Sequence, residues 1–173
     1  MHFLTYYNNN VVKYDLINKF ICKNSTILPK LSFISLRFNF NSHDLKQLFS
    51  GLFALELIAG QKSTFIKSNS FNLNLKIKKG YPVGCKVVLR NLKMQQFLVN
   101  LFNKILTTNK KYKISVKPNN SFSITIKNIL IFSNLEKNYQ FFKNLNSLNI
   151  SIGINTKNIN FIKFLLNSYK IKT

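Results

Sequence analysis

The sequence predicts a single α+β domain, and three observations support this class. Its 173 residues fall within the usual size of one domain. Apolar residues recur with the helical period in some segments and alternate like strand residues in others. No internal repeat and no linker divides the chain, so we expect residues 1–173 to form one domain around a shared core.

A helix followed by a strand is predicted at the start of the chain. Apolar residues recur at helical spacing over residues 3–20, and Pro29 stops any continuation of that helix. Residues 31–40 are rich in β-forming side chains and nearly alternate between apolar and polar positions. This strand therefore has one apolar face, while Arg37 and Asn39 share the other.

The second predicted helix has the strongest pattern in the chain. Its apolar positions run through residues 45–58, with a start near Asp44 and an end at Gly60. Leucine and phenylalanine dominate this stripe. We expect most aromatic side chains on such apolar faces, Phe49 and Phe53 among them, to belong to the core.

The rest of the chain alternates between strands and helices. Residues 61–84 predict a strand, a long mobile basic loop at 68–79 and a returning strand. The pattern continues with a strand at 85–90 and a helix at 92–106. The remaining predicted elements are a hairpin of strands at 112–116 and 122–126, an irregular stretch at 135–146, a strand at 148–154 and a helix at 159–166.

The charge of the chain is its most unusual property. Lysine and arginine number 26 against 4 aspartate and glutamate, which gives a formal net charge of +22. Self-repulsion at this charge destabilises a compact state, and a polyphosphate that releases its counterions compensates for it. No apolar run approaches the roughly 18 residues that span a membrane, and no segment pairs a dense basic face with an aromatic one. We therefore expect a nucleic acid as partner, and no membrane.

The residue types needed for catalysis or metal binding are scattered. Cys22 and Cys85 lie far apart and form no CxxC or His-containing ligand spacing, so we expect both to be free, buried thiols. His43 and Asp44 are neighbours whose side chains diverge on a helix, which favours a helix start over an acid–base pair. No nucleotide-binding or hydrolase motif occurs. We expect no enzymatic activity, no metal site and no cofactor.

Two short blocks of sequence carry a specific resemblance. The first is Ala59-Gly60-Gln61-Lys62, and the second is Gly80-Tyr81-Pro82-Val83-Gly84-Cys85-Lys86-Val87 with Leu89-Arg90. Glycine, proline, cysteine and arginine at fixed offsets in so short a block are unexpected in a chain with only 5 Gly and 3 Pro. On these blocks the chain resembles the bacterial-type large-subunit ribosomal protein family L five, over roughly its whole length and most convincingly in its first half.

The resemblance implies both a fold and a set of partners. The fold is an antiparallel sheet with helices packed on one face, whose other side docks on 5S rRNA and large-subunit rRNA at the central protuberance. The loop at 68–79 reaches toward P-site tRNA, and neighbouring ribosomal proteins include a small-subunit protein at the subunit bridge. Lysine acts toward phosphate as a mobile point charge, so Lys76, Lys78 and Lys79 fit the tRNA contact.

Six further residues are expected to bind rRNA. Arg37 and Arg90 are the only arginines in a sequence that otherwise uses lysine, which indicates a need for guanidinium geometry. Gln61 and Lys62 follow a helix end, where a solvated terminal turn is the competing interpretation. The full expected set is Arg37, Gln61, Lys62, Lys67, Lys86 and Arg90. Gly80, Pro82 and Gly84 are expected to shape the turn rather than to touch RNA.

The chain departs from the family pattern at places that bear on its partners. The family's Arg- and Gly-rich stretch after the third helix is shortened here to residues 107–113 and holds no arginine. The family's threonine before Leu89-Arg90 is Val88. A bidentate phosphate fork and a hydroxyl donor are thereby lost. Two alternatives for the RNA partner therefore remain: 5S rRNA together with large-subunit rRNA, or large-subunit rRNA alone.

Composition also bears on where the protein is made. Phe, Ile, Asn, Lys, Tyr and Ser are frequent, a set that A+T-rich codons encode and that is typical of organelle genomes. The first residues contain no Arg-rich amphipathic presequence and no signal-peptide apolar region. We therefore expect an organelle-encoded protein of the ribosome in the mitochondrial matrix. The alternative is a free organellar RNA-binding module, such as an RNA chaperone or a splicing factor.

Overall fold

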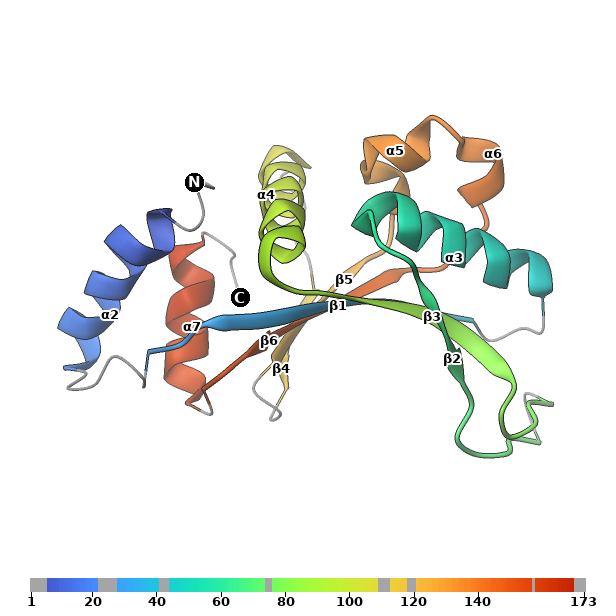
Figure 1. Cartoon of the computed structure of the whole chain (residues 1–173), viewed down its shortest axis with the longest axis horizontal. Coiled ribbons are helices and arrows are strands. Elements are labelled where there is room, and N and C mark those ends of the chain that lie inside the picture. The colour runs from blue at the N-terminus through green and yellow to red at the C-terminus, as the bar shows by residue number, and fades with distance from the viewer. Residues whose placement is uncertain are drawn as a thin grey trace. The chain divides into compact units, whose positions relative to one another are not determined.

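Six strands form one sheet in the order β2-β3-β1-β6-β5-β4 (Figure 1). The computed structural model describes residues 6–21, 28–40, 44–73, 76–108, 113–117, 121–156 and 158–169. The strands are β1 Leu31–Asn39, β2 Thr64–Lys67, β3 Pro82–Leu89, β4 Lys113–Lys117, β5 Ser121–Ile126 and β6 Leu148–Ile154. Strands β2 and β3 pair antiparallel. The predicted α+β class with an antiparallel sheet is confirmed.

The helices connect and cover these strands. They are η1 Asn8–Val12, a π-helical turn, followed by α2 Lys13–Phe20, α3 Leu45–Ala59, α4 Asn91–Thr108, η3 Ile129–Ile131, α5 Ser133–Glu136, α6 Tyr139–Phe142 and α7 Ile159–Ser168. The long predicted helices are confirmed in the described residues. The stretch 135–146, expected to be irregular, instead contains α6 and the end of α5, because helices of four residues are too short to show a period. No helix among the described residues is long and apolar enough to cross a membrane.

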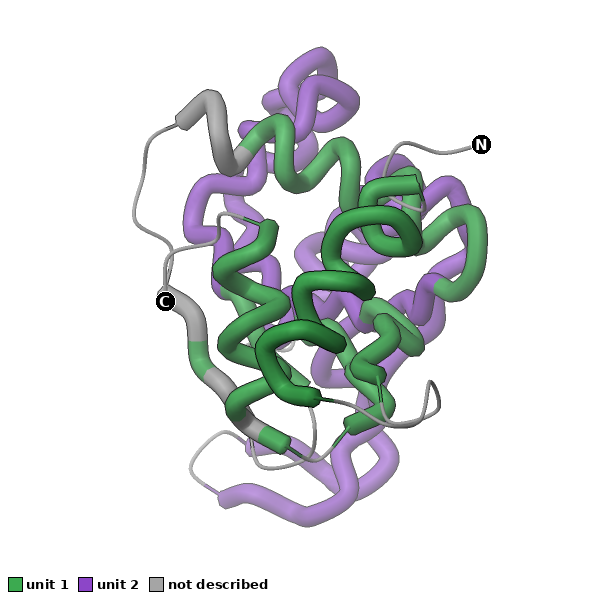
Figure 2. The backbone as a smooth tube through the Cα atoms, turned by 90° about the vertical axis from the view of Figure 1, so that its left-hand side faces the viewer, with its two compact units in different colours: residues 1–34, 90–124, 151–173 green, residues 35–89, 125–150 purple. Residues whose placement is uncertain are grey.

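Contacts divide the chain into two compact units, which Figure 2 distinguishes by colour. Unit 1 comprises residues 1–34, 90–124 and 151–173, and unit 2 comprises residues 35–89 and 125–150. Strands β1, β5 and β6 each contribute residues to both units. Each unit has a core of its own, and the expectation of a single domain stays a prediction.

In unit 2, helices α3, α5 and α6 lie on one side of the strands (Figure 1). In the unit 2 part of β1, Leu36 and Phe38 are fully buried, whereas Arg37 and Asn39 are exposed, as the alternation predicted. Helix α3 ends at Gly60, whose φ of 59° lies in the left-handed region that glycine adopts without strain. The buried face of α3 consists of Leu48, Gly51, Ala54 and Leu55.

The outer face of α3 corrects the expectation that Phe49 and Phe53 are core residues. Phe49 is 52% exposed and Phe53 is 57% exposed. The apolar stripe of this helix is wider than the face that meets the sheet and the neighbouring short helices. The periodicity of a sequence predicts which face of a helix is apolar. It does not predict how much of that apolar face other elements cover.

In unit 1, residues from the two ends of the chain pack together. The Phe20 ring meets Phe161 edge to face, with centroids 4.6 Å apart. The hydroxyl of Tyr7 donates a hydrogen bond to the carbonyl of Ser168 at 3.1 Å. One residue further along, the Tyr169 hydroxyl donates to Oδ1 of Asn8. These contacts fasten η1 and α2 to α7.

Candidate nucleic-acid interface

The face of the unit 2 strands opposite α3 carries several polar and basic side chains. Strand β1 places Arg37 on this face, and β3 places Lys86 there between the buried Cys85 and Val87. Because β1 and β3 are neighbours in the sheet, Arg37 and Lys86 project to the same side from adjacent strands. We name the polar part of this surface the open face, and it consists of Arg37, Asn39, Thr64, Lys86, Thr125 and Asn149. The half-buried Ile66 and Val88 lie on the same side, and Ser35 is buried there.

Hydrogen bonds within the open face position its polar groups. Nε of Arg37 donates to Oγ of Ser35 at 3.1 Å, which holds the guanidinium against the strand. The hydroxyl of Thr125 donates to Oδ1 of Asn149 at 3.0 Å. A planar guanidinium in a fixed position suits the recognition of phosphate oxygens.

The charge of unit 2 is strongly positive. It holds eleven Lys and Arg residues against three Asp and Glu residues. One of these acids, Glu56, accepts a hydrogen bond at its Oε1 from the backbone N–H of Ser63 at 3.0 Å. That carboxylate is therefore engaged at the turn between α3 and β2. Clustered cations with few acids among them give a potential that attracts polyanions.

Three other expected RNA-binding residues lie near the ends of β2. The Nε2 of Gln61 donates to the carbonyl of Val88 at 3.4 Å, so the side chain ties the end of α3 to β3. Lys62 is exposed directly after it. Lys67 is exposed opposite Pro82, where the β2–β3 register shifts. The RNA contacts of these three residues stay predictions.

The sixth expected residue, Arg90, belongs to unit 1. It is exposed, and its carbonyl accepts a hydrogen bond from the N–H of Met94 at 3.3 Å in the first turn of α4. Arg37, Lys86, Gln61, Lys62 and Lys67 thus share one unit, and Arg90 lies in the other. An RNA contact by Arg90 stays a prediction.

The basic loop between β2 and β3 continues as a narrow hairpin. The backbone N–H of Ser68 donates a hydrogen bond to the carbonyl of Tyr81, and the Ser68 carbonyl accepts one from the N–H of Gly80. The hydroxyl of Ser68 donates to the carbonyl of Lys78 at 2.6 Å. Asn72 and Ile77 then exchange two backbone hydrogen bonds, each of 3.0 Å. The three lysines expected at tRNA, Lys76, Lys78 and Lys79, are all exposed on this hairpin. The mobility expected of this loop stays a prediction.

The backbone geometry requires glycine at two positions of the second sequence block. A Cβ on Gly84 would lie 2.4 Å from the carbonyl oxygen of Phe38 in β1. Close by, the N–H of Phe40 donates to the carbonyl of Val83 at 2.9 Å. Gly80 has a φ of 85°, which other residues rarely adopt. Both glycines therefore shape the backbone that presents Lys86.

The cysteine of the same block is chemically inert. Cys85 is a free, buried thiol whose Sγ donates to the carbonyl of Leu48 at 3.4 Å, as expected for this residue. Burial raises the pKa of the Cys85 thiol to about 11, which keeps it protonated at neutral pH. Cys22, His2 and His43 lie outside the described residues. Within the described part of the chain, no group of three His, Cys, Asp or Glu could hold a metal ion.

One exposed aromatic residue in the unit 1 part of β1 was not expected from the sequence. Phe33 precedes the buried Ile34 in β1 and is 36% exposed. A Cβ on Gly153 of β6 would lie 2.4 Å from the Phe33 ring, so the ring lies directly on that glycine. A glycine inside an alternating strand often marks such a close approach, and Gly153 was the available signal. An exposed ring on a sheet is a surface on which a base can stack.

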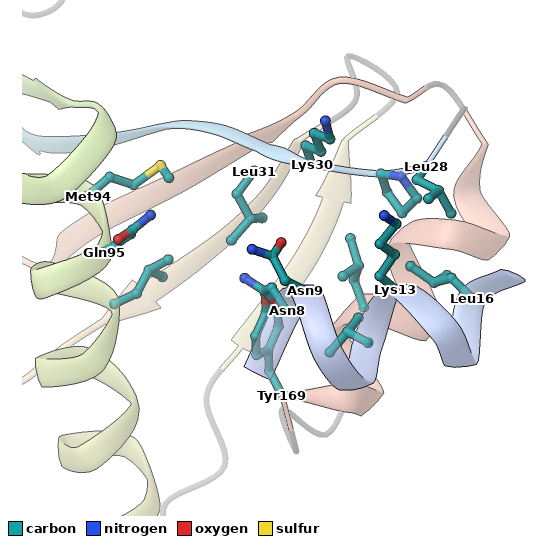
Figure 3. Close-up of a pocket in the computed structure, with 14 residues that line it drawn as sticks. Asn8, Asn9, Lys13, Leu16, Leu28, Lys30, Leu31, Met94, Gln95 and Tyr169 are labelled. Atoms are coloured by element: carbon teal, nitrogen blue, oxygen red, sulfur yellow. The ribbon is translucent and has the colours of Figure 1, made fainter. Parts of the chain in front are cut away.

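Unit 1 also contains a cavity of about 360 Å³ (Figure 3). Asn8, Asn9 and Lys13 approach it from one side and Gln95 of α4 from another. Among the described residues, the buried Oε1 of Gln95 has no hydrogen-bond partner. An unpaired buried acceptor destabilises the fold unless water or a ligand supplies the missing donor.

We predict that Gln95→Leu raises the free energy of unfolding by about 1 to 2 kcal/mol, because it removes an unpaired buried acceptor. Urea unfolding followed by circular dichroism measures this change. The control is Gln96→Leu, which alters the exposed neighbour and should stay within about 0.5 kcal/mol of the parent. A loss of stability in Gln95→Leu would show that a water or another group pairs with the oxygen in solution.

The fold and the open face together define a class: an α+β protein whose unit 2 has helices on one side of its strands and polar side chains, with Arg37 and Lys86 among them, on the other. A sheet face is one of the surfaces through which RNA-binding domains contact RNA. Comparison with known proteins is more specific. Residues 82–173 match the C-terminus of the ribosomal L five P family, which is more than half of the chain. The chain belongs to this ribosomal L five family, which confirms the resemblance carried by the two sequence blocks.

Individual relatives agree with this assignment. The large ribosomal subunit protein uL5m of Reclinomonas americana is 33% identical over 115 residues, which cover 65% of this chain and 63% of the relative. The uL5 protein of Nitrosomonas europaea is 38% identical over 102 residues, covering 58% and 56%. That of Clostridium tetani is 39% identical over 90 residues, covering 51% and 50%. The chain thus matches between half and two thirds of the length of these relatives.

Proposed function

We propose that this protein is a structural constituent of the large subunit of a mitochondrial ribosome and binds rRNA through the open face of unit 2. The single observation that carries the proposal is that Arg37 and Lys86 are both exposed on adjacent strands, on the side of the sheet opposite α3. Family membership and similarity to a uL5m protein support the ribosomal and mitochondrial parts of the proposal. Organelle encoding belongs to the same proposal.

The partners we propose follow the expectations of the family. They are large-subunit rRNA at the central protuberance, 5S rRNA where the ribosome contains it, and neighbouring ribosomal proteins that include a small-subunit bridge protein. The hairpin with Lys76, Lys78 and Lys79 would lie near P-site tRNA. Its three exposed ammonium groups support this contact, because they can reach phosphate oxygens without a fixed geometry.

The double variant Arg37→Gln with Lys86→Gln tests the open face. If both side chains neutralise phosphates, the slope of log affinity against log salt for an rRNA fragment should become shallower by about 2. Fluorescence anisotropy with a labelled fragment of mitochondrial large-subunit rRNA measures this slope. The same titration with 5S rRNA, where it exists, assigns the partner.

The matched control is Lys137→Gln with Lys143→Gln, which removes two exposed positive charges from the segment of α5 and α6 in the same unit. Its slope should change by clearly less than that of the open-face variant. Equal changes in the two variants would refute the open face as the binding surface. Sedimentation separates the ribosomal role from a free RNA-binding module, since only a ribosomal constituent should migrate with the large subunit at high salt.

A further inference from the structure

The outer face of α3 carries an apolar surface that the open face does not use. Leu45, Phe49, Phe53 and Leu57 follow one another at intervals of four residues and are 55%, 52%, 57% and 43% exposed. Residues at this spacing lie on one side of a helix, so the four side chains form a continuous stripe, which we name the α3 stripe. Contiguous exposed apolar surface of this kind marks interaction sites in soluble proteins.

Strand β2 widens the α3 stripe. The ring of Phe65 meets that of Phe49 edge to face, with centroids 6.1 Å apart and an interplanar angle of 83°. Phe65 is itself 40% exposed. The two rings hold each other in place while each keeps an exposed surface. Aromatic side chains fixed in this way lose little conformational freedom on binding, which suits the centre of an interface.

We propose that the α3 stripe binds an acidic amphipathic helix of another protein. Lys46 is exposed on α3 beside Leu45, and Lys62 and Lys67 are exposed at the two ends of β2. With eleven basic against three acidic residues in unit 2, carboxylates at the border of the partner's apolar face would meet opposite charge. The apolar faces would pack together, as amphipathic helices do in hydrophobic grooves.

Charge and chemistry argue against two other occupants. A second copy of this chain would bring a net charge of +22 against another of +22. The four side chains of the α3 stripe carry no hydrogen-bond donor, so RNA phosphates placed on them would lose water without gaining a partner. The α3 stripe shares no residue with the open face. Lys62 and Lys67 at its border also belong to the expected rRNA-binding set, so variants of Phe49 and Phe53 test peptide binding without changing that set.

Titration of the full-length protein with a synthetic peptide tests the proposal. The peptide is helical, with leucine and phenylalanine on one face and glutamate on the other. Isothermal titration calorimetry should give a dissociation constant of about micromolar order. The variant Phe49→Ser with Phe53→Ser should weaken binding about tenfold or more, because it removes the centre of the α3 stripe without changing charge.

The matched control is Tyr14→Ser with Leu92→Ser, which removes two exposed apolar side chains from unit 1 and should bind the peptide like the parent. All four replaced residues are more than half exposed, so circular dichroism should show both variants folded. Equal binding of a scrambled peptide of the same composition would overturn the proposal in favour of bulk charge attraction. So would stripe-dependent self-association in sedimentation equilibrium, or stripe-dependent binding to anionic phosphatidylglycerol vesicles without binding to the peptide.

Discussion

The affinity of the full-length protein for large-subunit rRNA is expected to fall by about 10³-fold or more between about 50 and 200 mM monovalent salt if six or more phosphates are contacted. The cause is the release of counterions by lysine and arginine, of which the chain has 26. Each neutralised phosphate adds to the slope, so the slope counts the contacts. Anisotropy titrations at four or more salt concentrations measure it.

The loop lysines supply an internal control for this salt dependence. A triple variant with Lys76, Lys78 and Lys79 changed to Gln should keep most of the rRNA slope and lose affinity for tRNA, if the hairpin serves tRNA. A flat salt response of the parent protein would rule out phosphate neutralisation as the basis of binding. Loss of rRNA affinity in the triple variant would assign the hairpin to rRNA instead.

Replacing Gly84 by alanine is expected to destabilise the protein by about 3 kcal/mol, at the upper end of the usual cost of overpacking. The added methyl carbon would lie 2.4 Å from the carbonyl oxygen of Phe38. This oxygen belongs to the backbone of a paired strand, so it cannot relieve the clash by a rotamer change, as a flexible side chain could. Strands β1 and β3 would have to separate. Thermal unfolding followed by circular dichroism should show a midpoint about 10 °C lower.

Gly80→Ala is the appropriate comparison for Gly84→Ala. Gly80 has a φ of 85°, yet nothing lies within 4 Å of the position that its Cβ would occupy. Its replacement should therefore cost only the strain of the backbone conformation, about 1 to 2 kcal/mol. If the two variants unfolded at the same temperature, close strand approach at Gly84 would not be the reason for its glycine.

Much of the fold could be predicted from the sequence, because its longer elements bury one face each. The alternation of Leu36, Arg37 and Phe38 is the alternation of the sheet, and Gly60 ends α3 as its position indicates. The short helices α5 and α6 could not be predicted, since four residues make barely one turn. The returning strand expected within residues 61–84 and the strand expected at 85–90 are one strand, β3, which runs from Pro82 to Leu89 without a break.

The candidate site could be predicted in part. Arg37 and Lys86 lie on the same side of adjacent strands, as alternation and strand order require. The hydrogen bond of Gln61 to the Val88 carbonyl could not be foreseen, because it depends on how the turn after α3 meets β3. The exposure of Phe49 could not be predicted either, because it depends on which elements cover the helix and not on the apolar pattern of the helix itself.

The contacts of η1 and α2 with α7 affect the order in which this protein can fold during its own translation. Tyr7 bonds Ser168 and Asn8 bonds Tyr169, so partners lie 161 residues apart along the chain. Residues 159–168 must leave the exit tunnel before α7 can make these contacts, and until then η1 and α2 expose the apolar side that includes Leu16 and Phe20. Unit 2 needs no residue beyond 150. Unit 1 should therefore be completed last, and its early segment is where a nascent-chain chaperone would be needed.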